Sequence, residues 1–155
     1  MKSHFFNYHC TNCNCVFKVP KLANQAYGEF LLRSSDGSDE AYLNALNDPT
    51  YDEVHQILKS NVKTAHKSAN ALADILRKIY GAVACDPDGA GGAYQLAGSP
   101  KCPSCGSQES ASWEATEPPE YIDKEVNPVT HSNWNQLASE EKAHKVDAVL
   151  SLLGC

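Results

Sequence analysis

The chain has 155 residues and a formal net charge of −6, with 42% hydrophobic and 21% charged residues. This composition excludes an intrinsically disordered chain and allows one domain with a modest core. No run of about 18 apolar residues is present, so we expect no membrane-spanning helix, and we recognise no secretory signal. We therefore expect a cytoplasmic protein, in which clustered cysteines are typically metal ligands.

The first sixty residues contain predicted strands and a short predicted helix. Aromatic and β-branched runs at 5–8 and 15–19 flank a cysteine pair, which favours a hairpin with the pair in its turn. Residues 29–33 are a further predicted strand. Residues 38–46 are predicted to form a short helix that ends before Pro49.

Residues 50–80 give the clearest helical pattern, because apolar or small residues recur every three or four positions. Two N-terminal caps fit: Thr50 with Glu53, or Asp48 with Pro49 at the first helical position. A helix this long is unusual in a small domain, so it either breaks near residues 67–70 and folds back, or projects and pairs with another chain. Gly81 is the predicted end.

The remaining segments alternate between loops and regular structure. Residues 86–98 are a glycine-rich loop, residues 109–117 a strand, and residues 118–121 a proline-containing linker. Ser132 is predicted to cap a turn, and Ser139 to begin a final helix that continues to residue 153.

Two cysteine pairs carry the main chemical signal. Cys10 and Cys13 form one C-x-x-C hook, and Cys102 and Cys105 form another. Together they supply the four thiolates of a closed structural zinc site. If one ion binds both hooks, the residues between them are an insertion; the alternative is two independent pairs of thiols.

The hooks resemble the knuckles of the zinc ribbon and rubredoxin-like group. Pro103 and Gly106 in the second hook match that pattern, whereas the first hook has Asn14 where the group usually has glycine. The resemblance implies a small antiparallel ribbon that binds one zinc ion. Together with the elements predicted above, this gives an α+β fold: the zinc ribbon (1–35 and 100–117), a large helical insertion with a glycine-rich loop (38–98), and a linker with a C-terminal helical tail (118–155). The insertion is far longer than the spacing in compact ribbons.

Three further cysteines lie outside the hooks. Cys15 follows the first hook by two residues, and strand alternation places it away from the metal side. Cys85 and Cys155 are expected to be a small buried residue and a terminal thiol.

Several functions fit this pattern. We expect no enzyme, because four cysteines leave no open metal position and no catalytic motif is present. The favoured interpretation is a structural zinc protein whose amphipathic region 50–80 binds a protein partner or a second copy. One alternative is nucleic-acid binding through Lys59, Lys63 and Lys67, spaced four apart on one predicted helix face. Another is a rubredoxin-like electron carrier with iron in place of zinc.

Overall fold

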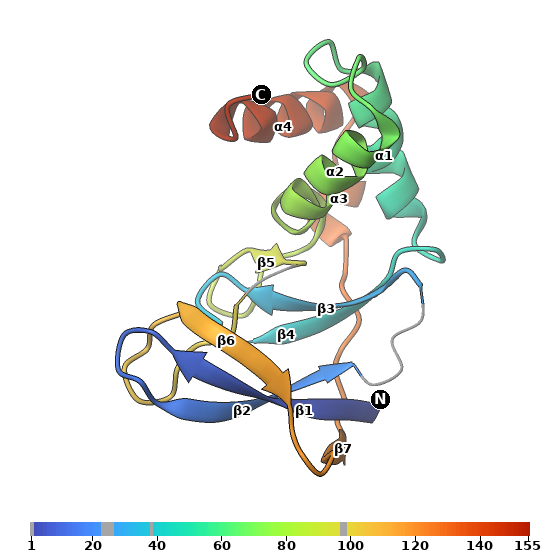
Figure 1. Cartoon of the computed structure of the whole chain (residues 1–155). Helices are drawn as coiled ribbons and strands as arrows, with labels where there is room; N and C mark the ends of the chain where they lie inside the picture. The colour runs from blue at the N-terminus through green and yellow to red at the C-terminus, as the bar shows by residue number, and fades with distance from the viewer. Residues whose placement is uncertain (1, 23–26, 38, 97–98) are drawn as a thin grey trace.

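The computed structural model describes residues 2–22, 27–37, 39–96 and 99–155. Its helices gather at one end and a four-stranded sheet lies at the other, with a three-stranded sheet between them (Figure 1). The predicted α+β class is confirmed, since antiparallel sheets and four α-helices make up the described chain.

The four-stranded sheet joins the two ends of the sequence. Strand β1 (Lys2–Cys10) pairs with β2 (Val16–Leu22) on one side, and with β6 (Ser110–Ala115) and β7 (Tyr121–Asp123) on the other. All these pairings are antiparallel. The predicted hairpin and the predicted strand near residues 109–117 are therefore confirmed.

The three-stranded sheet contains a correction. Strand β3 (Glu29–Ser34) pairs with β4 (Glu40–Asn44) and β5 (Tyr94–Gln95). The predicted helix over 38–46 is wrong because residues 40–44 form β4. Ala41 and Leu43 alternate with more exposed residues and face the core, as a half-buried strand requires.

The predicted long helix is two helices. Helix α1 (Pro49–Ser60) begins at the Asp48 cap, whose side chain accepts the Thr50 N–H at 3.0 Å, so the second predicted cap is the correct one. Helix α2 (Ala69–Ala84) begins after the Ser68 cap. The two helices pack against each other. The predicted helix therefore breaks and folds back, and it does not project as one long helix.

Gly81 does not end α2. The helix continues to Ala84, and Gly81 lies where the backbone of β5 crosses it. A Cβ atom built on Gly81 would lie 1.8 Å from the Tyr94 carbonyl oxygen. The glycine therefore permits close packing of helix on strand.

The core lies between the helices and the three-stranded sheet. Helix α3 (Ser132–Asn135) inserts the fully buried Trp134, and helix α4 (Ser139–Leu152) adds Val146 and Leu150. The helix predicted to begin at Ser139 is confirmed. The final segment is thus a packed part of the helical end.

Candidate metal centre

The two cysteine hooks fold into the same turn. In the first, the Cys10 N–H donates to the Cys15 carbonyl at 2.9 Å and the Asn14 N–H donates to the Cys10 carbonyl at 3.0 Å. In the second, the Cys102 N–H donates to Ser107 at 2.8 Å and the Gly106 N–H donates to Cys102 at 2.9 Å. The hooks are therefore two copies of one knuckle, although they lie far apart in sequence.

Both knuckles need a left-handed residue just after the second cysteine. Asn14 has φ 60° and Gly106 has φ 76°. Glycine adopts this conformation freely, and asparagine is among the few other residues that tolerate it. The departure of Asn14 from the expected glycine thus leaves the turn intact.

The paired strands bring the knuckles together. The sulfur atoms of the four hook cysteines lie within 4.8 Å of one another. Cys10 Sγ is 3.5 Å from Cys105 Sγ, and Cys13 Sγ is 3.7 Å from Cys102 Sγ. Zinc–sulfur bonds of about 2.3 Å give a tetrahedron with edges of about 3.8 Å, so the cluster is compatible with a metal-binding site.

The electrostatics of the cluster favour a cation. Hydrogen bonds from the Asn12 side chain and the Ser107 N–H lower the pKa of the Cys105 thiol to about 6. The Cys15 N–H also stabilises the Cys13 thiolate, but desolvation and the neighbouring sulfurs outweigh it and raise the pKa of Cys13 to about 12. A divalent cation between the sulfurs would stabilise all four thiolates at neutral pH.

The other cysteines lie outside this cluster. Cys15 Sγ accepts a hydrogen bond from the Ser104 hydroxyl at 3.3 Å. Cys85 is buried, and burial raises the pKa of its thiol to about 12, so it stays protonated at neutral pH. Cys155 is exposed.

The three lysines of the nucleic-acid hypothesis do not share one helix face. Helix α1 ends at Ser60, so only Lys59 is helical, while Lys63 and Lys67 lie in the connection to α2. The Lys63 ammonium is 3.1 Å from the Asp147 carboxylate and 2.7 Å from the Ser151 hydroxyl. The expected continuous stripe is wrong, and the nucleic-acid role stays a prediction.

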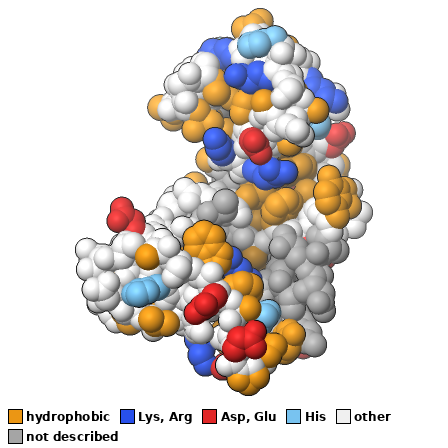
Figure 2. Space-filling view, viewed as in Figure 1, with side chains coloured by type: hydrophobic (Ala, Val, Ile, Leu, Met, Phe, Trp, Pro, Cys, Tyr) orange, Lys and Arg blue, Asp and Glu red, His pale blue; other side chains and the backbone are white. Residues whose placement is uncertain are grey.

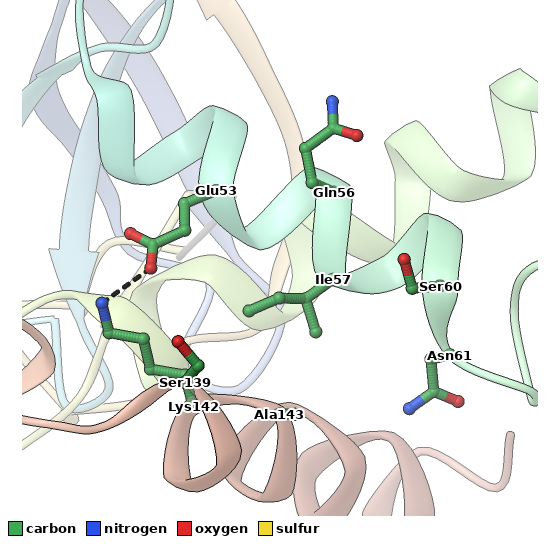
Figure 3. Close-up of a pocket in the computed structure, with 8 residues that line it drawn as sticks. All are labelled: Glu53, Gln56, Ile57, Ser60, Asn61, Ser139, Lys142 and Ala143. Atoms are coloured by element: carbon green, nitrogen blue, oxygen red, sulfur yellow. Dashed lines mark hydrogen bonds and ion pairs between the residues drawn. The ribbon is translucent and has the colours of Figure 1, made fainter.

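Helix α4 packs against α1. A pocket of about 370 Å³ separates α1 from α4, with Ile57 and Ala143 on opposite walls (Figure 3). At one end the Lys142 ammonium bonds to Glu53 at 2.6 Å, and at the other Asn61 donates to Asp147 at 3.1 Å. Helices α1 and α4 are thus joined at both ends of the pocket, which is a small gap in their packing.

A polar cluster that no sequence pattern predicts lies around Asp48. The Asp48 carboxylate accepts hydrogen bonds from the Tyr80 hydroxyl and from His131 Nε2, both at 2.8 Å. His131 Nδ1 lies 2.7 Å from the Ala84 carbonyl oxygen. The cluster joins the start of α1, the end of α2 and the segment before α3. Its residues are distant in sequence and form no motif.

Comparison with protein-family models, with curated proteins and with solved structures finds no match for this chain. Among the described residues, no helix has the length and apolar character needed to cross a membrane. A functional inference therefore depends on this chain's own residues, chiefly the cysteine cluster.

Proposed function

We propose that this chain is a non-enzymatic protein stabilised by one structural zinc ion, which Cys10, Cys13, Cys102 and Cys105 bind. The observation that carries the proposal is the convergence of two knuckles with the same backbone hydrogen bonds, whose four sulfurs lie within 4.8 Å of one another. The first knuckle connects β1 to β2, and the second precedes β6, which pairs with β1 from a distant part of the sequence.

The ligand set supports a structural role over a catalytic one. Four thiolates complete a tetrahedral shell, and catalytic zinc sites usually have three protein ligands and an open position for water or substrate. Cys10 and Cys102 are almost fully buried, which limits access from one side.

We further propose that the helical end mediates protein–protein interaction. Large hydrophobic side chains are exposed on or beside its helices, with Leu46 66% and Val62 87% accessible to solvent. Most of the Lys and Arg side chains seen in Figure 2 lie over this end. In protein–protein interfaces the buried centre is apolar and the rim is polar, so exposed apolar side chains with charged ones around them are compatible with this role.

Metal analysis of protein purified without added metal tests the zinc proposal. We expect about one zinc per chain and a colourless sample, because zinc has no partly filled d shell. Iron in the same shell would give a coloured protein that changes its spectrum on reduction. Such a result would replace the structural-zinc function with electron transfer.

A further inference from the structure

A large groove lies between α1 and α2. It measures about 1160 Å³, and the end of the β3–β4 hairpin closes one side. Small-molecule pockets usually measure about 300–1,000 Å³, and this groove exceeds that range, so it has room for a polypeptide segment. Figure 2 shows hydrophobic side chains between the helices and the strands, with acidic and basic ones beside them.

The floor of the groove is apolar. Leu72 and Leu76 of α2 are buried beneath it, and Ala69 and Ala73 line the same helix. The two alanines leave room for the close approach of another helix. Tyr27 stands at the mouth with 89% of its surface exposed.

The three faces of helix α1 have different surroundings. Val54 and Leu58 pack in the core. Glu53 contacts α4 through Lys142, as Figure 3 shows. The third face lines the groove and carries three charged or titratable side chains: Asp52, His55 and Lys59.

The groove face of α1 carries charged side chains that have no ionic partner among the residues that the structure describes. In the residues that the structure describes, the side chains of Asp52, His55 and Lys59 form no hydrogen bond or ion pair. Other charged side chains on α1 and α2 do form them, such as Glu53 with Lys142 and Arg77 with Asp74. A partner on this surface would meet a solvent-exposed negative charge near one end, at Asp52, and a positive charge near the other, at Lys59.

The charge pattern is complementary to itself. Asp52 and Lys59 are seven residues apart, about 10 Å along the helix at ~1.5 Å per residue. In a two-fold interface, if one residue contacts a second across the axis, the second also contacts the first. Two antiparallel α1 helices related by an axis beside His55 would therefore pair Asp52 of each copy with Lys59 of the other.

We propose that the groove binds a second copy of this chain, so that the protein is a two-fold dimer with α1 of each copy seated against α1 and α2 of the other. This inference rests on the interaction role proposed for the helical end and does not depend on the metal. Two reciprocal Asp52–Lys59 ion pairs would fix the antiparallel direction, and the exposed Tyr27 and Leu46 at the edge of the groove would supply apolar surface for the contact.

Charge reversal on the intact chain tests the dimer, with mass measured by sedimentation equilibrium across the micromolar range. We expect a dimer for the parent chain. Asp52→Lys and Lys59→Asp should each weaken dimerisation by roughly tenfold or more, because like charges then face each other. The double variant Asp52→Lys/Lys59→Asp restores the opposite pairing and should recover most of the affinity.

Lys78→Asp is the matched control, since it makes the same change at an exposed α2 position that does not line the groove. A monomeric parent, or a double variant no tighter than the single ones, would overturn the dimer. Zinc content and thermal unfolding of each variant separate this outcome from failure of the zinc proposal. A monomer that retains zinc refutes the dimer alone, and a dimer without zinc refutes the metal site alone.

Discussion

The strand end and the helical end of this molecule are stabilised by different means. The main hydrophobic cluster contains side chains from β3 onward, including Tyr80, Trp134 and Leu150, and none from β1, β2, β6 or β7 among the described residues. The four-stranded sheet instead leaves Trp113 58% exposed. A metal ion at its knuckles would supply the stability that a small hydrophobic core cannot.

The largest expected effect comes from removing one candidate metal ligand at the knuckles of the four-stranded sheet. Cys102→Ser removes one ligand, and structural zinc sites contribute about 10–16 kcal/mol of apparent binding energy, which is coupled to folding. We expect amide hydrogen exchange in β1 and β6 to lose its protection while α1 and α2 keep theirs. Cys155→Ser is the control, because that cysteine is exposed and outside the cluster. Unchanged protection in Cys102→Ser would show that the sheet needs no metal.

The second effect tests the helical end. Trp134 is fully buried, donates from Nε1 to Glu53 at 3.1 Å, and lies beneath the Lys142 ammonium. Trp134→Ala should lower the free energy of unfolding by about 3–5 kcal/mol in denaturant titrations.

The matched control for this change is Trp113→Ala on the exposed sheet face, which should cost far less. Zinc content should be unchanged in both variants. Equal losses of stability in the two variants would contradict the division between the ends.

The smallest effect is a pH dependence within the helical end. Partial burial raises the pKa of Asp86, but the N–H groups of Asn133 and Ser132 and the Thr130 hydroxyl outweigh it and hold the pKa at about 2. Because the folded-state pKa lies below the unfolded value of about 3.9, this stabilisation is present above pH 4 and is lost as pH falls toward 2.

Asp86→Asn removes this titration. The variant should therefore show a shallower loss of stability between about pH 4 and pH 2 than the parent chain does. Identical acid unfolding curves would show that the hydrogen bonds of Asp86 to the start of α3 contribute nothing to the free energy of unfolding.

The sequence predicted local features better than it predicted tertiary ones. The knuckles, the hairpin, the Asp48 cap and the start of α4 depend on neighbouring residues, so their patterns were readable. Residues 40–44 were misassigned because acidic residues at 39–40 suggested a helix start, whereas pairing with β3 decides for a strand. Gly81 was misassigned because its role depends on β5, which is distant in sequence.

The candidate site shows the same division. The four candidate ligands can be predicted from the two C-x-x-C hooks, and their convergence follows from the pairing of β1 with β6. The groove face of α1 could not be predicted, because it depends on which sides of the helix α2 and α4 cover. The Lys63–Asp147 contact likewise brings together charges from opposite halves of the chain.

The most direct test of the account is the zinc content per chain of the parent and of variants with one ligand removed from each hook. One ion shared by both knuckles predicts about one zinc in the parent, and a loss of tightly bound zinc from both Cys13→Ser and Cys102→Ser. Retention of the full metal content in either variant would contradict a shared four-cysteine site.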